Sequence, residues 1–377
     1  MKKTFVLILT LALLSTSAFA QSKKRNKKTE KPAKEQKTET SNRRVKNIIF
    51  LVGDGMGTAQ VYASIVAKQD QSAFLRFPFS GFSRTYSNNK YTTDSGAGGS
   101  ALMTGHKVNN STIAQSPDGE IYPSFLKVAH DEMGKATGFV VSCNVLDATP
   151  SSTYAHVAER HMWDEISMQM ALCDHDVMIG ANINAFLPGN RKDGKSPLDT
   201  LEKRGYTIIT DMQELIATKD KKYCALLSDD DAPGDAEKRD NWLVPSTVKA
   251  IETLSKDKDG FILMIEGSQI DWAGHNNDFP YMLKELNEFE LVLNYVLNFA
   301  EQDGETLVVV TADHETGGLT LNDGNIDDGE TSAPMFTTGS HTGVMVPVFS
   351  YGPGAELFSG VQQNTSFFDK FMSLLKK

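Results

Sequence analysis

The sequence predicts an α/β fold, a three-layer αβα sandwich with a mostly parallel central sheet. Short apolar runs recur along the chain and alternate with helical patterns such as residues 282–299. The runs show no polar alternation, which is typical of strands covered by helices on both faces. Strands that alternate with helices favour parallel order in one sheet. The expected strands lie at 48–52, 139–142, 206–210, 223–227, 261–265, 307–310 and 344–348.

The N-terminus carries the pattern of an export signal. Lys2-Lys3 precedes a short apolar core at 5–14, and Ala18-Phe19-Ala20 fits a small-x-small cleavage site. The apolar core is too short to span a bilayer. We therefore expect a signal peptide over residues 1–20, cleavage after Ala20, and a periplasmic or secreted mature chain without a transmembrane anchor.

Residues 21–46 form a basic segment that is almost free of apolar side chains. The first 46 residues hold 13 Lys and Arg against 3 Glu. Such a segment buries too little surface to offset its ordering entropy, so we expect a disordered linker. It either tethers the protein to anionic lipid or cell wall or remains a solvated tail, and the second is the commoner role of a charge run.

Residues 47–377 are expected to form one domain, because no internal repeat or linker divides them. The whole chain has 38 basic and 48 acidic residues, so this part keeps 25 and 45, a net charge of −20. A body this acidic argues against a nucleic-acid binding surface, which needs a basic face, and favours divalent cations.

The cysteines do not indicate a catalytic or zinc-binding role. There are three, Cys143, Cys173 and Cys224, so at least one thiol stays unpaired within a single chain. A disulfide between Cys173 and Cys224 is open in an oxidising compartment, and sequence does not decide it. Their spacing is not that of a zinc site.

Three of the apolar runs end on a carboxylate. The runs at 48–52, 261–265 and 307–310 lead into Asp54, Glu266 and Asp313. Ligands of open parallel sheets bind beyond the carboxyl ends of the strands. Carboxylates delivered there by separate strands repel one another unless cations lie between them. The pattern therefore predicts a metal site.

Histidines accompany these carboxylates. Asp271 and His275 are four residues apart, which places both on one side of a helical turn, His314 follows Asp313, and His341 stands among small residues. Zinc accepts mixed nitrogen and oxygen ligands, whereas magnesium prefers oxygen, so the set suffices for more than one ion. A single histidine or aspartate is more often a packing or capping residue; convergence of separate segments favours ligands.

Two further segments suit phosphoryl chemistry. Ser95 precedes a run of very small residues, typical of a helix N-terminus that attracts an anion, and a nearby metal would activate its hydroxyl as a nucleophile. The alternative is that Ser95 only caps the helix. Thr149 offers an oxygen to a hard cation, and Arg160 offers a planar fork to two phosphoryl oxygens or lies on a solvated helix face.

Together these motifs resemble the metal-dependent alkaline phosphatases. The matching segments are Asp-Ser-Gly-Ala-Gly-Gly, Asp-Ala-Thr-Pro, Glu-Gly-x-x-Ile-Asp-x-x-x-His, Ala-Asp-His-Glu-Thr-Gly-Gly and Ser-His-Thr, in order from Asp54 to His341. The resemblance implies hydrolysis of small phosphate monoesters with release of inorganic phosphate, and a family that commonly forms homodimers. One departure is Trp272, where related enzymes carry Lys or His.

The resemblance also implies two Zn²⁺ ions, one Mg²⁺ ion and a role for each residue. One zinc would be held by Asp271, His275 and His341, and the other by Asp54, Asp313 and His314. The magnesium would share Asp54 with Thr149 and Glu266, with Asp147 reaching it through water. Ser95 would become the phosphoserine, and Arg160, oriented by Asp94, would bind the phosphoryl group.

Two other kinds of function compete with this interpretation. Three alternatives belong to the same superfamily: a phosphodiesterase, a sulfatase and a cofactor-independent mutase. Rates of hydrolysis of a monoester and of the matching diester would distinguish a phosphodiesterase from a phosphomonoesterase. Outside this superfamily stands an exported metal-scavenging protein without turnover. Such a protein has no use for Ser95 and Arg160 together.

Overall fold

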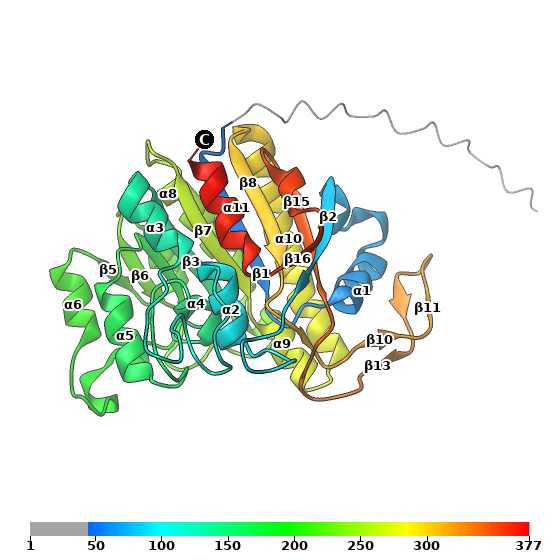
Figure 1. Ribbon diagram of the computed structural model, residues 1–377, viewed down its shortest axis with the longest axis horizontal. Coiled ribbons are helices and arrows are strands. Elements are labelled where there is room, and N and C mark those ends of the chain that lie inside the picture. The colour runs from blue at the N-terminus through cyan, green and yellow to red at the C-terminus, as the bar shows by residue number, and fades with distance from the viewer. Residues whose placement is uncertain (1–43, 377) are drawn as a thin grey trace, which may run out of the picture. The chain divides into compact units, whose positions relative to one another are not determined.

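The computed structural model describes residues 44–376, and a ten-stranded sheet runs through them (Figure 1). Its order is β16-β2-β15-β8-β1-β7-β3-β4-β6-β5, and β15 alone runs antiparallel to its neighbours. The mostly parallel sheet predicted from the sequence is confirmed. Its strands are β1 (Asn47–Gly53), β2 (Phe79–Arg84), β3 (Ala136–Asn144), β4 (Val177–Ala181), β5 (Thr207–Ile209), β6 (Tyr223–Leu226), β7 (Phe261–Gly267), β8 (Thr306–Thr311), β15 (Val346–Tyr351) and β16 (Gly360–Gln363).

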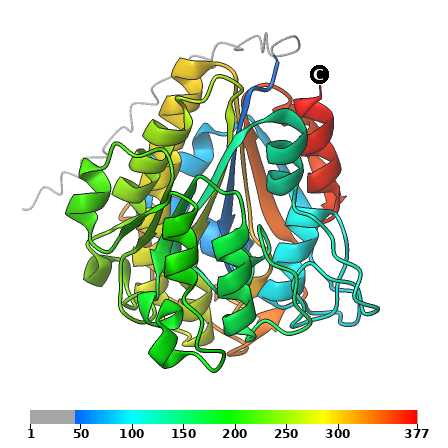
Figure 2. The same cartoon turned by 90° about the vertical axis from the view of Figure 1, so that its left-hand side faces the viewer.

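Helices cover both faces of the sheet, as Figure 2 shows edge-on. In β1, Ile48, Phe50 and Val52 enter one core and Ile49 and Leu51 the other. The first core packs against α2 (Ser95–Thr104), α3 (Phe125–Met133), α5 (Trp163–Leu172), α6 (Pro197–Lys203) and α11 (Ser366–Leu375). The second packs against α1 (Thr58–Lys68), α7 (Met212–Ala217), α8 (Leu243–Leu254) and α10 (Phe279–Asp303). This is the expected three-layer αβα arrangement.

All seven predicted strands are present, with shifted ends. The strand expected at 344–348 begins at Val346 and extends to Tyr351, because it pairs with both β2 and β8. The strand expected at 139–142 is β3, which covers Ala136–Asn144 and is buried throughout. The helix expected at 282–299 is α10, with Asp278 as its N-cap and Gly304 as its left-handed C-cap.

The strands that end on carboxylates are neighbours at the centre of the sheet. β1 lies between β8 and β7, with Val52 opposite both Thr311 and Glu266. Asp54, Glu266 and Asp313 therefore meet at one edge, since parallel strands end on the same side. Two short helices, α4 (Ala148–Ser151) and α9 (Gln269–His275), begin at this edge.

Short two-stranded ribbons extend the same edge. β9 (Glu315–Thr316) pairs with β14 (His341–Thr342), which brings His341 beside the segment that follows β8. The others join β10 (Thr320–Leu321) to β13 (Pro334–Met335) and β11 (Gly324–Asn325) to β12 (Glu330–Thr331).

Further expectations concern the cysteines, the N-terminal segments and a membrane anchor. All three cysteines are buried and free, so Cys173 and Cys224 form no disulfide. The signal peptide and most of the basic segment lie outside the described residues. Of that segment, Val45 is buried in the first core and the Lys46 N–H donates to the Glu305 carbonyl (2.9 Å), so its last residues pack against the domain. Within residues 44–376 no helix has the length and apolarity needed to cross a bilayer.

Candidate active site

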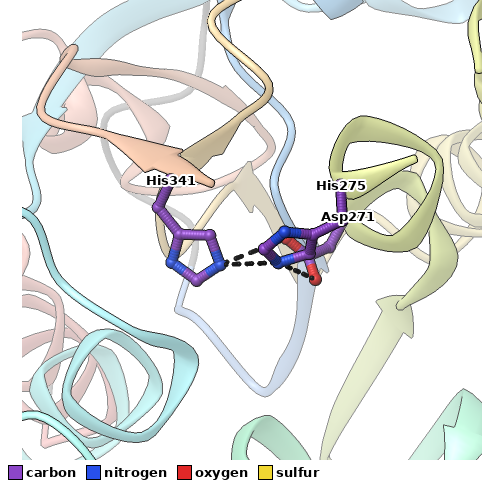
Figure 3. Close-up of side chains that lie close together, drawn as sticks. All are labelled: Asp271, His275 and His341. Atoms are coloured by element: carbon purple, nitrogen blue, oxygen red, sulfur yellow. Dashed lines mark hydrogen bonds and ion pairs between the residues drawn. The ribbon is translucent and has the colours of Figure 1, made fainter. Parts of the chain in front are cut away.

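Asp271, His275 and His341 point toward one another from α9 and β14 (Figure 3). The Nε2 atoms of the two histidines are 3.1 Å apart, and each is 3.4 Å from an oxygen of Asp271. Asp271 and His275 lie on the same side of α9, as their four-residue spacing predicts. The three ligating atoms surround one point.

Hydrogen bonds at the other ring nitrogens set the orientation of both imidazoles. His275 Nδ1 lies 2.9 Å from the Gly339 carbonyl, and His341 Nδ1 lies 2.9 Å from the Thr93 carbonyl. Since a carbonyl only accepts, each Nδ1 carries a proton, so in the neutral form of each imidazole the Nε2 lone pair points toward the other ring. Two lone pairs and a carboxylate facing one point fit a zinc ion.

Protonated histidines would stabilise the carboxylate of Asp271 in this arrangement. Burial alone would raise the pKa of Asp271, but its bonds to His275 and His341 hold that pKa far below its usual value. The bond to Asp271 raises the pKa of His275 to about 9. The site therefore favours positive charge, which a divalent ion supplies more compactly than two imidazolium groups.

A second set lies beside the first and comprises Asp54, Asp313, His314 and Ser95. His314 Nε2 is 3.1 Å from Asp313 Oδ2, 3.5 Å from Asp54 Oδ1 and 3.2 Å from Ser95 Oγ. The His314 ring stacks on that of His341, with centroids 3.5 Å apart. The two sets are therefore in direct contact through these stacked rings. The Ser95 hydroxyl lies against the second set.

Carboxylates and a hydroxyl line the third part of the site. Glu266 is 1% exposed and Thr149 is 1% exposed. Three buried oxygens, Asp54 Oδ1, Thr149 Oγ1 and Asp313 Oδ2, have no hydrogen-bond partner among the described residues. Burying such groups unpaired is unfavourable, and oxygen donors alone are what Mg²⁺ prefers.

Burial and mutual repulsion raise the pKa values of these carboxyl groups. Burial and the Asp313 charge raise the pKa of Glu266 to about 8. Burial and the Asp271 charge raise that of Asp313 to about 6, and the pKa of Asp54 is raised well above its usual value for the same reasons. Burial and Asp231 raise that of Asp147, the N-terminal flank of α4, to about 7. Arg160 lowers the pKa values of Asp54 and Asp147, and His341 lowers that of Asp313, but neither offsets the rise.

Small residues allow α2 to approach the carboxylates. A Cβ at Gly98 would lie 3.1 Å from Asp313, and one at Gly99 would lie 3.3 Å from the Cα of Thr149. Ser95 is the first residue of α2 and is 5% exposed. Asp94, not Ser95, is the N-cap, so the serine hydroxyl is left free of the capping role.

Asp94 also connects the helix to Arg160. Its Oδ1 accepts from the Ala97 N–H (3.0 Å), its Oδ2 accepts from the Ser111 N–H (2.8 Å), and Arg160 Nη1 lies 3.4 Å from Oδ2. The Arg160 N–H donates to the Ser111 carbonyl (2.7 Å). Arg160 thus lies in the loop before α5, turned toward the N-terminus of α2, and not on a solvated helix face.

Two residues that sequence analysis did not single out contact the proposed metal ligands. The Thr316 hydroxyl donates to Asp271 Oδ1 (2.5 Å) and lies 3.2 Å from His314 Nδ1, so it links the two histidine-containing sets. Glu315 is 4% exposed and accepts from Gln60 Nε2 (2.8 Å) and from the Thr342 hydroxyl next to His341. Both lie in the Asp-His-Glu-Thr segment, but only pairing of β9 with β14 shows what they contact.

The chain resembles known proteins along most of its length. A family model described as alkaline phosphatase matches residues 45–333. Alkaline phosphatase 3 of Bacillus subtilis is 31% identical, over 97% of this chain and 96% of its own length. The alkaline phosphatase of Escherichia coli is 27% identical, over 87% of this chain and 85% of its own.

Solved structures agree. That of the alkaline phosphatase from the Antarctic bacterium TAB5 aligns with a TM-score of 0.82 and 36% identity, covering 88% of this chain and 99% of the other. A variant of that enzyme was solved with Mg bound in its M3 site. The Thermus thermophilus alkaline phosphatase, at 22% identity and a TM-score of 0.81, has the same fold.

Proposed function

This chain belongs to the alkaline phosphatase family, whose members are phosphate monoester hydrolases, and we propose that it works through a phosphoserine on Ser95 with two Zn²⁺ ions and one Mg²⁺ ion. One zinc would bind Asp271, His275 and His341. The other would bind Asp54, Asp313 and His314. The magnesium would bind Asp54, Thr149 and Glu266, with Asp147 reaching it through water.

The observation that carries this proposal is the convergence of unpaired ligand atoms around one serine. Two groups of carboxylate and imidazole atoms have the spacing of metal sites, and the orphaned oxygens of Asp54, Thr149 and Asp313 adjoin them. Ser95 Oγ lies 3.2 Å from His314 Nε2. The donor set mixes nitrogen and oxygen at two places and is oxygen-only at the third, which fits zinc and magnesium respectively.

The protein's own residues place the phosphoryl group. Arg160, held by Asp94, would donate to two phosphoryl oxygens, and the N–H groups at the start of α2 would attract the dianion. Ser95 Oγ would form a bond to phosphorus while the bond from phosphorus to the alcohol oxygen breaks on the opposite face. Bound divalent ions would supply a lowered pKa for the serine hydroxyl and stabilise negative charge on the entering and leaving oxygens.

A phosphoseryl enzyme then requires water to attack from the side the alcohol has left. The bond between Ser95 Oγ and phosphorus then breaks, which regenerates the serine hydroxyl. Inorganic phosphate is released from its place beside Arg160. Arg160 and cations together neutralise a dianion, which favours monoesters over diesters because a diester carries one charge less.

The direct test is Ser95→Ala in the metal-loaded protein. We expect loss of most nitrophenyl phosphate hydrolysis with near-normal zinc and magnesium content by atomic emission. The wild type should incorporate radioactive phosphate on Ser95 when quenched in acid. A variant that kept full activity would show that Ser95 is not the nucleophile.

Two comparisons separate the rival functions. Bis-nitrophenyl phosphate should be cleaved far more slowly than nitrophenyl phosphate; faster diester cleavage would indicate a phosphodiesterase. A protein that binds zinc but turns over neither ester would be a scavenger. We also propose that the protein is exported after cleavage at Ala20 and forms a homodimer. The N-terminal sequence of the native protein tests the first, and analytical ultracentrifugation tests the second.

A further inference from the structure

A second cleft opens beyond the carboxyl ends of β3, β4 and β6. Its volume is about 610 Å³. It is lined by acidic, amide and aromatic side chains, chiefly Asn144, Trp163, Asp164, Asn182, Asp230 and Asp231. Asn144 ends β3, Asn182 directly follows β4, and Asp230 and Asp231 follow β6, so the cleft lies at the same edge of the sheet as the proposed catalytic residues.

This cleft adjoins the residues proposed to bind phosphate. Asp147 follows Asn144 by three residues and interacts electrostatically with both Asp231 and Arg160. Trp163 begins α5 three residues after Arg160. The cleft therefore lies beside the segments that carry Asp147 and Arg160, on the side of β4 and β6.

One fully buried side chain in the cleft wall lacks a partner. Asn144 is 0% exposed, and its Oδ1 accepts from the Leu146 N–H (2.9 Å), which fixes the orientation of the amide. Its Nδ2 has no hydrogen-bond partner among the described residues. A buried donor without an acceptor is unfavourable, so the cleft is suited to a ligand that brings an oxygen.

The charges of the cleft define which ligands it repels. Asp230 accepts from Asn184 Nδ2 (3.0 Å), and Asp231 accepts from the backbone N–H groups of Asn144 and Ala232. Neither Asp230 nor Asp231 forms an ion pair within residues 44–376, whereas Asp164, which also lines the cleft, lies 4.0 Å from Arg191 Nη1. Among the described residues no Lys, Arg or His lines the cleft. A second anionic group on a substrate would be repelled, whereas hydroxyl groups find acceptors in the carboxylates and donors in the amides.

Trp163 adds an apolar face to this polar surface. Trp163 is 39% exposed and borders the cleft. An accessible indole ring beside carboxylates and amides suits a ligand that has C–H groups on one face and hydroxyls on its edges.

We propose that this cleft binds the alcohol half of the substrate, and that this half is polyhydroxylated and carries no negative charge of its own. The inference rests on the proposed phosphomonoesterase function and deepens it by naming a substrate class. Asp230 would exclude anionic alcohols, and Trp163 would bind the carbon chain or ring.

The test uses two linear six-carbon substrates that differ at the end remote from the phosphate. Sorbitol 6-phosphate ends in a hydroxymethyl group and 6-phosphogluconate in a carboxylate. The wild type should prefer the first by about tenfold in kcat/KM, and Asp230→Asn should narrow that ratio several-fold. Asp229→Asn is the matched control, since Asp229 is exposed, has the same charge and does not line the cleft.

Trp163→Ala should raise KM for sorbitol 6-phosphate several-fold and leave the hydrolysis of methyl phosphate, whose alcohol is too small to reach the cleft, within twofold. Leu172→Ala, on the exposed side of the same helix, is its control.

If methyl phosphate is cleaved but the ratio of kcat/KM for sorbitol 6-phosphate to that for 6-phosphogluconate is equal in the wild type and in Asp230→Asn, this inference is wrong and the proposed function stands. If the wild type cleaves no monoester, both are wrong.

Discussion

Two groups of buried carboxylates in this protein differ in what compensates them. On α10, Glu285 and Glu288 are buried, and Arg239 lies 2.7 Å and 2.8 Å from them through Nη2. At the carboxyl edge of the sheet, Asp54, Glu266 and Asp313 are also buried, and within residues 44–376 none of them forms an ion pair with an arginine or lysine. An arginine of the chain neutralises the first group, whereas we propose that divalent ions neutralise the second.

The contrast shows how to distinguish a structural acid cluster from a ligand site. Burial raises the pKa of Glu285 to about 7, and Arg239 opposes that rise. For Glu266 the second largest contribution is the Asp313 charge, which raises the pKa further. A raised pKa alone therefore does not distinguish the two kinds of cluster. The sign of the neighbouring charge does: a cation lies beside the structural carboxylates, and further carboxylates lie beside those of the proposed metal site.

Removing divalent ions should have the largest effect, and only at the uncompensated group. We expect a strong chelator to abolish nitrophenyl phosphate hydrolysis and to lower Tm by several degrees, because bound ions stabilise the folded state by mass action. Zinc with magnesium should restore both. Full activity in chelator, after the metal content has been shown to be negligible, would exclude the metal mechanism.

Removing Arg239 from its ion pairs with Glu285 and Glu288 should destabilise the fold and leave the metal content unchanged. Arg239→Met leaves two buried carboxylates without their partner and should lower the free energy of unfolding by about 3–5 kcal/mol. Urea denaturation measures this. Zinc content per folded molecule should stay at the wild-type value, and a loss of zinc equal to that of a ligand variant would mean that the two groups are not independent.

Thr316→Val tests how the uncompensated group is positioned. The variant keeps the shape of the side chain but removes the hydroxyl between Asp271 and His314. We expect zinc affinity to fall about 10–100-fold, the usual range for partners of metal ligands. Thr316→Ser should retain most affinity by competition with a chromophoric chelator, whereas equal losses in both variants would point to packing and not to the hydroxyl.

The stability of the metal-free protein should fall with rising pH. The pKa of Glu266 is raised to about 8 in the folded state, above its usual value of 4.5, so folding favours its protonated form. That stability is present below pH 4.5 and is lost as pH rises to about 8. Tm of the chelated protein should therefore decrease by a few degrees between pH 5 and pH 8, and Glu266→Gln should flatten the slope.

Much of the site could be predicted because several of its proposed metal ligands stand at strand ends. Asp54, Glu266 and Asp313 follow apolar runs that read as buried strands, and neighbouring parallel strands must deliver them to one edge. Asp271 and His275 were placed together by helical spacing. The Gly-rich segment after Ser95 predicted a helix N-terminus, and α2 begins there.

What the sequence by itself determined was the fold class, the residue types of the site and the strands that carry them, because periodicity and strand-end placement are local properties. The tertiary structure decided the rest. It alone placed β1 between β8 and β7, left Cys173 and Cys224 unpaired, assigned Thr316 and Glu315 to the ligands, and opened the cleft beside Asp147. These features depend on which distant segments become neighbours, and that order is set by packing of the whole sheet.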